Sequence, residues 1–432
     1  MSAIHNEIAV FNRPAKENAI EETDWVEHRP SGAIERNSPL VFQLNGLQRD
    51  YILPSKCLLK VMCKVFRDDG TPLDATDEVA LENLSLHTLF RQVDVYLQQQ
   101  LISAATGVNY PYKAYIDVST LYNHDVKDSQ LQSEGYFKDL AGFMEDPSVN
   151  SGYSLRKSLT AKSNEVDFEG VLHVDIAQQG KAILNGVPLT IKLFQHDDKF
   201  RLFSPKHGQP NVPTYHVKIT DAILKVCYIK LKPFVLFAHA ERLKKSPAIY
   251  PYWRSDIKSF GIAAGSLTFA QDDIFQGLVP NKLVVAFVTS AAYSGDFKQN
   301  PFNFKNFGLN YLELAVDGRS LPTVPFQPKY AVDSNNSYLH TGYVTEYLSL
   351  FRHEYPQKSG NFINRADFPR GYAIYTFTIK PGTGEELYSD IKKGHTRLTA
   401  RFDKALTESV TAIVYGVFPS EFRIDHTRNV LV

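Results

Sequence analysis

Cysteine is scarce in this sequence. Only Cys57, Cys63 and Cys227 occur among 432 residues, and no two of them form a CxxC pair. Cys57 and Cys63 share one apolar stretch and Cys227 lies in another, a setting typical of small buried hydrophobic side chains. We therefore expect three reduced, buried thiols and a reducing compartment, and not a disulfide framework.

Net charge and long apolar runs are also missing. Lysine and arginine together number 47, as do aspartate and glutamate, which argues against a protein that holds nucleic acid by bulk positive charge. No run approaches the ~20 apolar residues of a membrane span, and residues 1–14 lack the basic start and apolar core of a signal peptide. We expect a chain that is made in the cytosol or nucleus, is not secreted and has no membrane span.

Common catalytic motifs are absent. No GxGxxG or P-loop opens a helix after a strand, and no HExxH occurs. One metal pattern remains: His173 and Asp175 form an HxD pair that would share one strand face, and His216 follows at a suitable distance for a second histidine. These residues would make the iron site of a jelly-roll oxygenase, in one half of the chain only. Because HxD arises easily by chance, the sequence favours no catalytic site, no metal and no cofactor.

Alternating apolar and polar residues dominate what is present. The length predicts two domains of roughly 200 residues each. Period-two segments rich in β-branched and aromatic residues predict strands at residues 171–176, 188–193, 222–231, 372–379 and 412–418. Helical periodicity is confined to residues 113–122, 235–245 and 344–352. The chain is therefore predicted to be all-β with short helices.

Two halves of the sequence repeat each other. "ILPSKCLLKV" at residues 52–61 resembles "LVPNKLVVAF" at residues 278–287, which lies 226 positions later. "FRQVDVYLQQQLI" at residues 90–102 aligns with "LNYLELAVDGRSL" at residues 309–321, and a Tyr-rich segment and short helix follow each. This order predicts two tandem eight-stranded antiparallel jelly rolls, a double jelly roll, with short helices in the loops and in the linker.

The repeat also sets the predicted domain boundaries. Residues 1–37 form an N-terminal arm, 38–235 the first jelly roll, 236–250 a linker, and 251–432 the second jelly roll. The arm would lie over a neighbouring subunit, with Val10, Phe11 and Trp25 as anchors; a disordered tail is the alternative.

Aromatic residues are numerous. The chain has 28 Phe and 23 Tyr, many of them in loop stretches such as residues 300–311 and 360–372. A monomer rarely leaves so many rings exposed. We therefore expect part of these rings to pack on another chain.

Several longer stretches resemble one known family. "LENLSLHTLFRQVDVYLQQQLIS" from Leu81, "YPYKAYID" from Tyr110, "YFKDLAGFMED" from Tyr136 and "FEGVLHVDIAQQGKAILNGVPLTIKL" from Phe168 are together similar to the double jelly-roll major capsid proteins of Polinton (Maverick) elements and adintoviruses. A more distant likeness extends to those of virophages and nucleocytoplasmic large DNA viruses. The resemblance covers residues 38–250 well and the second half through its repeat. Residues 97–100 read "LQQQ", where relatives tend to carry an Asn-Gly turn.

The resemblance implies a structural, non-catalytic role in a virion. Such proteins form homotrimers in which six jelly rolls make a pseudo-hexagonal capsomer, and capsomers tile an icosahedral shell around double-stranded DNA. The implied partners are further copies of the chain and a penton or minor capsid protein, with no strong direct nucleic-acid binding. The long loops at residues 123–165 and 351–370 would cap the outward face or make threefold contacts. Besides the oxygenase, a carbohydrate-binding or glycosidase-like tandem β-protein stays open, which would need an exposed aromatic cleft.

Overall fold

The computed structural model describes residues 17–46, 50–103, 109–331, 342–351, 360–379 and 390–432. Its first half contains a five-stranded and a four-stranded antiparallel sheet. The first has the order β1 (Ile20–His28), β11 (Tyr215–Leu231), β4 (Leu58–Arg67), β8 (Val166–Val171), with β3 (Asp50–Ile52) also on β11. The second has the order β2 (Leu40–Leu44), β9 (Leu189–Gln195), β6 (Phe90–Leu97), β7 (Gln100–Leu101).

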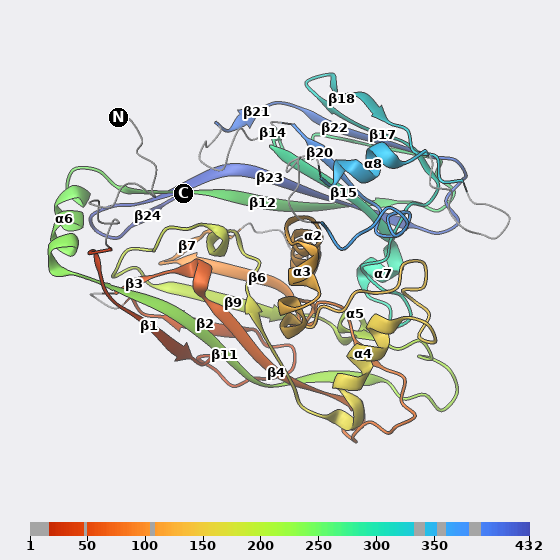
Figure 1. Ribbon diagram of the computed structural model, residues 1–432, viewed down its shortest axis with the longest axis horizontal. Helices are drawn as coiled ribbons and strands as arrows, with labels where there is room; N and C mark the ends of the chain where they lie inside the picture. Colours follow the sequence, from red (N-terminus) through yellow and green to blue (C-terminus); the bar gives the residue numbers. More distant parts are fainter. Residues whose placement is uncertain (1–16, 47–49, 104–108, 332–341, 352–359, 380–389) are drawn as a thin grey trace, which may run out of the picture.

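The second half repeats this arrangement strand for strand. One sheet has the order β12 (Ala248–Ile262), β23 (Val410–Ile424), β15 (Lys282–Thr289), β20 (Ile374–Thr378), with β24 (Val430–Leu431) on β23. The other has the order β13 (Thr268–Asp272), β22 (Thr396–Phe402), β17 (Leu309–Val316), β18 (Arg319–Phe326). Figure 1 shows the two halves as separate groups of sheets that lie against each other. The chain is a double jelly roll, as the sequence predicts.

Short elements fill the connections. Three two-stranded ladders pair β5 (Ala80–Leu81) with β10 (Leu202–Phe203), β14 (Leu278–Val279) with β21 (Lys392–Lys393), and β16 (Phe304–Lys305) with β19 (Arg370–Gly371). The helices are α1 (Ser85–Thr88), α2 (Tyr110–Leu121), α3 (His124–Lys127), α4 (Ser151–Leu159), α5 (Asp198–Arg201), α6 (Pro233–Leu243), α7 (Ser290–Ser294) and α8 (Val344–Ser349). Four 3₁₀ turns are η2 (Pro54–Lys56), η3 (Gln130–Glu134), η4 (Ala161–Ser163) and η5 (Asp175–Gln178). Within the described ranges, no helix is long and apolar enough to cross a membrane.

The aligned residues of the repeat occupy equivalent places. Val95 in β6 and Leu314 in β17 are both fully buried, and each is paired across the ladder with an inward-facing residue of the next strand, Ile191 in β9 and Leu398 in β22. Because side chains alternate along a strand, this shared register puts the same positions of both halves into a core.

The hairpin turn that departs from the family pattern is preserved. Asp317 and Gly318 have φ of 50° and 77° in the second half, values that suit a two-residue hairpin turn. In the first half Gln98 has φ of 54°, so a glutamine adopts the left-handed conformation where Asn or Asp is more usual. The strand, turn and strand restart are therefore common to both copies.

The two cores are interlocked. Buried residues of the second half form one cluster with Tyr112, Tyr115 and Ile116 from α2 of the first half, and the Tyr115 ring stacks on Phe302 at 4.1 Å. In return, Tyr250 and other residues of β12, β23 and β24 join the core of the first half. Separating the halves would therefore expose apolar surface from both.

The N-terminal segment is only partly an arm. Val10 and Phe11 lie outside the described residues, but Ile20–His28 is strand β1 and pairs with β11 along its whole length. The Trp25 side chain is half exposed on this strand. This part of the predicted arm is thus held by its own chain. The domain boundaries themselves stay a prediction, with α6 as the connection between β11 and β12.

Four rings of the two aromatic loop stretches are buried, and the expectation that part of these rings pack on another chain stays a prediction for the others. Phe302, Phe304, Phe368 and Tyr372 are all buried within their own chain. Phe302 and Phe304 pack on Tyr115 of α2, and Phe368 packs on Tyr375 of β20. The three cysteines are free and buried, as predicted.

Candidate functional site

The predicted HxD pair is not on a strand. β8 ends at Val171, the Val174 N–H donates to Leu172 O at 2.9 Å in a tight turn, and Asp175 begins η5. The expectation of a strand at residues 171–176 is therefore wrong. His173 and Asp175 do not share a strand face, and each has its own set of partners.

Asp175 is bound by groups from both halves. Its carboxylate accepts hydrogen bonds from the Ser255 hydroxyl at 2.5 Å and the Ser255 N–H at 3.1 Å, both on β12. The Lys113 ammonium of α2 lies 3.2 Å away. With its side chain buried and these donors in place, Asp175 holds η5 against the second half.

His216 lies in a different part of the first half. It is on β11, where its ring stacks on Phe66 with the centroids 6.0 Å apart and its Nδ1 lies 3.9 Å from Asp68. Burial lowers the pKa of His216. Over the described part of the chain, the one group of three potential metal ligands that come together is His87, Glu134 and His173. The structure thus does not assemble the predicted His173, Asp175 and His216 site.

His173 is instead part of a buried polar group that sequence spacing could not reveal. Its Nδ1 lies 3.4 Å from Asp117 of α2, and its ring meets the His87 ring edge-on at 4.7 Å between centroids. His87 Nε2 is 3.0 Å from Glu134 Oε2. Members of this group are about 40 residues apart in sequence and carry no motif.

Charges in this region are balanced by close partners. Burial raises the pKa of the Asp117 carboxyl, but Lys113 and His173 outweigh it and hold that pKa well below its usual range. Burial likewise raises the pKa of Glu134, and the hydrogen bond with His87 outweighs it, so the net pKa is lowered. Burial lowers the pKa of His87. The carboxylates are thus ionised and the region is held together electrostatically.

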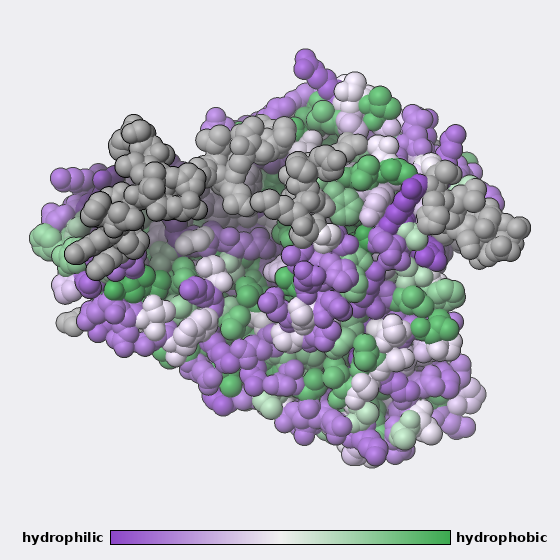
Figure 2. All heavy atoms as spheres, in the orientation of Figure 1, coloured by the Kyte–Doolittle hydropathy of each residue, from purple (hydrophilic) through white to green (hydrophobic). Residues whose placement is uncertain are grey.

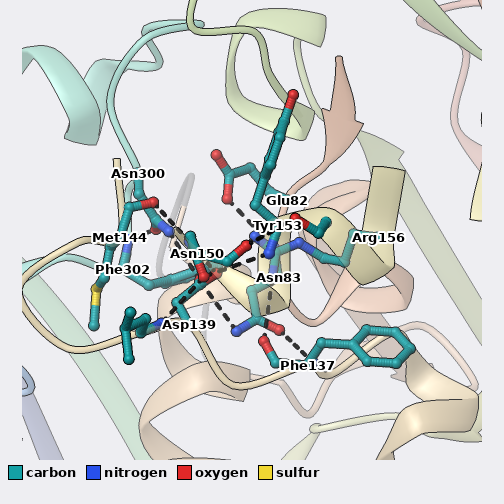
Figure 3. A network of polar contacts seen from close by, with 12 residues as sticks. Glu82, Asn83, Phe137, Asp139, Met144, Asn150, Tyr153, Arg156, Asn300 and Phe302 are labelled. Atoms are coloured by element: carbon teal, nitrogen blue, oxygen red, sulfur yellow. Dashed lines mark hydrogen bonds and ion pairs between the residues drawn. The ribbon is translucent and has the colours of Figure 1, made fainter. Parts of the chain in front are cut away.

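A second buried polar network joins the halves at Asp139 (Figure 3). The Asp139 carboxylate accepts hydrogen bonds from Arg156 at 2.9 Å, Asn150 at 2.9 Å and Asn83 at 3.4 Å, all from the first half. It also accepts one from Asn300 of the second half at 3.0 Å. The Arg156 guanidinium donates further to Leu81 O and Phe137 O. Each side chain of the network is buried, so removing one leaves a buried polar group of its neighbour without that hydrogen bond.

A surface pocket of about 420 Å³ adjoins this network. Two of the carboxylates that line it are Asp139 and Asp367, the first paired with Arg156 and the second with Lys138 at 2.6 Å. Both carboxylates are thus engaged in ion pairs and act as structural contacts. The pocket therefore gives no support to a glycosidase.

Large exposed apolar side chains gather in two places. Phe234 and Phe237 on α6 are 63% and 69% exposed; we name them the α6 patch, and green spheres mark the left end of the molecule in Figure 2, where Figure 1 draws α6. The second set, the loop patch, lies between residues 140 and 155 and consists of Leu140, Phe143, Val149 and Leu155, which are 42–52% exposed. Such side chains are typical of surfaces that another chain covers.

Comparison with known sequences gives one full-length relative. No protein-family model matches the chain. An uncharacterised protein of Caenorhabditis elegans is 22% identical over 431 residues, which cover 97% of this chain and 99% of that protein. The relative carries no functional description to transfer.

Comparison with solved structures is more informative. A chain of the Sputnik virophage structure is 10% identical, and the match covers 100% of this chain and 92% of the virophage chain with a TM-score of 0.66. The mavirus major capsid protein is 11% identical, and the match covers 100% of this chain and 95% of that protein with a TM-score of 0.53. The Faustovirus major capsid protein is 10% identical, and the match covers 98% of this chain and 92% of that protein with a TM-score of 0.52. Both halves and the connection between them thus match along nearly the whole length of these proteins.

Proposed function

We propose that the chain is a major capsid protein that forms homotrimeric, pseudo-hexagonal capsomers. The observation that carries this proposal is the full-length match of both jelly rolls to chains described as major capsid proteins. A match to one jelly roll alone would carry less weight, because this architecture hosts many functions.

Threefold symmetry of the trimer would explain why the chain contains two similar jelly rolls. Three copies of a chain with two similar halves place six jelly rolls around one axis, so a closed trimer has nearly sixfold edges. Such a unit fits a hexagonal lattice. The interlocked cores and the buried contacts of Asp139 and Asp175 make each chain one rigid building block, as repeated packing requires.

The exposed apolar side chains supply surfaces for self-association. The loop patch falls within the long connection at residues 123–165, which includes α3 and α4. We propose that it forms threefold contacts. The α6 patch lies at the opposite end of the molecule (Figure 1) and would contact neighbouring capsomers or a minor capsid component.

The wider assembly follows from the same proposal. Capsomers would tile an icosahedral shell around double-stranded DNA, completed by a penton or minor capsid protein, after synthesis in the host cytoplasm or nucleus. Equal numbers of basic and acidic residues suit a shell that encloses DNA without gripping it through phosphate neutralisation. The full-length worm relative suits an origin in a Polinton-type element carried in an animal genome.

Electron microscopy of the purified protein tests this proposal. Negatively stained particles should show hexagonal outlines with threefold averages, and sheets or closed shells should appear at high protein concentration. A field of small, asymmetric particles at all concentrations would contradict the proposal. Binding of the protein to a glycan array would instead support the carbohydrate alternative.

A further inference from the structure

The group of His87, Glu134 and His173 has the composition of a metal site. His87 lies on α1, Glu134 ends η3, and His173 lies in the turn between β8 and η5. One potential ligand atom from each residue lies within 4.8 Å of the other two. Two imidazoles and one carboxylate are a common ligand set for Zn²⁺ and for other divalent transition metals.

The spacing of the ligand atoms suits one ion. Metal bonds of about 2.0–2.1 Å at tetrahedral angles place ligand atoms about 3.3 Å apart. His87 Nε2 and Glu134 Oε2 are already 3.0 Å apart. The most distant pair is at most 4.8 Å apart, so reaching this separation needs a shift of at most about 1.5 Å.

A second observation points to a ligand independently. The His173 side chain is 3% exposed, and its Nε2 has no hydrogen-bond partner among the described residues. Leaving a buried polar atom unpaired is unfavourable, so such an atom needs an explanation. A bound cation would supply the missing partner, because the lone pair of a neutral imidazole nitrogen is a metal ligand.

The surroundings orient both rings for this purpose. His173 Nδ1 faces Asp117 at 3.4 Å, and His87 Nδ1 faces the Tyr110 hydroxyl at 2.9 Å. Metal-binding histidines usually have such a partner on the other ring nitrogen, which fixes the ring and the tautomer. The other ring nitrogens, the unpaired His173 Nε2 and the His87 Nε2 that meets Glu134, both face the group of three.

The third ligand is held just as closely. A Cβ at Gly170 would lie 2.3 Å from Glu134 Cγ and Oε1, so the glycine leaves the space that the carboxylate occupies. All three side chains are at least nine-tenths buried. Three protein ligands leave the fourth position of a tetrahedral ion to a single enclosed water, and bulk solvent has little access.

We propose that His87, Glu134 and His173 bind one divalent transition-metal ion, best suited to Zn²⁺, which fastens α1 and η3 to the turn after β8. The site is independent of the capsid proposal. Because the ligands are enclosed, the ion would enter during folding, and binding would add directly to the free energy of unfolding. It would anchor the base of the loop that carries the loop patch.

Metal analysis of the full chain tests the site. The protein is expressed in medium supplemented with zinc, manganese and iron, purified without affinity metals, and analysed by inductively coupled plasma mass spectrometry. We expect one zinc ion per chain in the wild type, loss of that ion in His173→Gln, and retention in His216→Gln. His216 is a fair control because its Nδ1 is also buried without a hydrogen-bond partner, yet it lies outside the group.

A second readout covers variants that do not fold. Wild-type protein refolded with Co²⁺ should show the visible absorption of a four-coordinate site, and refolding with a chelator should lower its melting temperature. Wild-type protein without stoichiometric metal under every supplement would overturn the proposal. So would a His173→Gln variant that keeps its full metal content.

Discussion

Tyr415 Oη donates a hydrogen bond to Asp117 Oδ1 at 2.9 Å and thereby joins β23 of the second jelly roll to α2 of the first. Both side chains are buried. The same carboxylate has Lys113 Nζ at 3.1 Å. One acid of the first half therefore serves as an anchor for the second, and the two jelly rolls behave as one body.

Replacing Tyr415 with Phe tests this anchor. Hydrogen bonds to a charged group contribute about 1.5–3 kcal/mol, so Tyr415→Phe should lower the free energy of unfolding by about 2 kcal/mol. Chemical denaturation followed by fluorescence measures the change. Tyr311→Phe is the control, because that hydroxyl donates to Glu313 two residues away on a partly exposed strand. Equal, small effects in both variants would show that the anchor is unimportant.

The Asp139 network should be far more sensitive. Arg156 and Asp139 are both 1% exposed and lie 2.9 Å apart. Arg156→Met leaves a buried carboxylate without its cation, a change that costs about 3–5 kcal/mol. The melting temperature and the yield of soluble protein should both fall sharply.

The matched control for that variant is an exposed pair. Arg423 contacts Glu421 at the surface, where the two side chains are 50% and 39% exposed. Arg423→Met should leave the melting temperature almost unchanged, because solvent screens such pairs. An Arg156→Met protein as stable as this control would contradict the structural role given to the network.

Glu82 predicts a distinct dependence of stability on pH. This fully buried carboxyl, labelled in Figure 3, has its pKa raised to about 8 by burial, which outweighs the opposing effect of Arg156. From about pH 5 to pH 7 the folded chain keeps a proton that the unfolded chain has lost. The contribution of Glu82 to the free energy of unfolding therefore decreases as pH rises through this window.

Glu82→Gln removes that dependence. The stability of this variant relative to wild type should increase with pH by up to about 1.4 kcal/mol per pH unit between pH 5 and pH 7. Denaturation midpoints at several pH values measure it, with the exposed Glu421→Gln as the control. Parallel pH profiles for wild type and Glu82→Gln would mean that Glu82 is ionised in the folded chain.

The loop patch can be tested by its effect on association. Leu140 and Leu155 are each about half exposed, so covering them in a trimer contributes about 1 kcal/mol apiece. Leu140→Ser with Leu155→Ser should weaken association at least roughly tenfold and leave the melting temperature of the monomer unchanged. Analytical ultracentrifugation measures the association constant.

A matched pair of replacements controls for surface hydrophobicity. Leu267 and Val324 are 52% and 71% exposed and lie outside both patches. Leu267→Ser with Val324→Ser should leave association unaffected. The same loss in both double variants, or no loss in either, would refute threefold contacts through the loop patch.

The repeat was the strongest signal in the sequence, and it predicted the fold. Period-two alternation places Val95 and Leu314 in the cores because a half-buried strand must alternate. β1 gave no such signal: four of its nine residues are acidic, and its side chains are almost all exposed. Its ladder with β11 is made by the backbone, which sequence patterns do not report.

The candidate site was less predictable for a related reason. Leu172, His173 and Val174 alternate as a strand does, but their segment turns into η5 because Asp175 is bound by Lys113 and Ser255. Contacts between halves override local preference here. His87, Glu134 and His173 meet only through the packing of three connections, so no spacing rule could have joined them.

The mass of the purified protein in solution tests the central claim most directly. Multi-angle light scattering should give a species of about 146 kDa, three times the chain mass of 48.8 kDa, as a closed cyclic trimer requires. The trimer should persist on dilution to the concentrations at which the loop-patch variant has dissociated. A stable species of one chain mass at every concentration would contradict the assignment of this double jelly roll as a capsomer subunit.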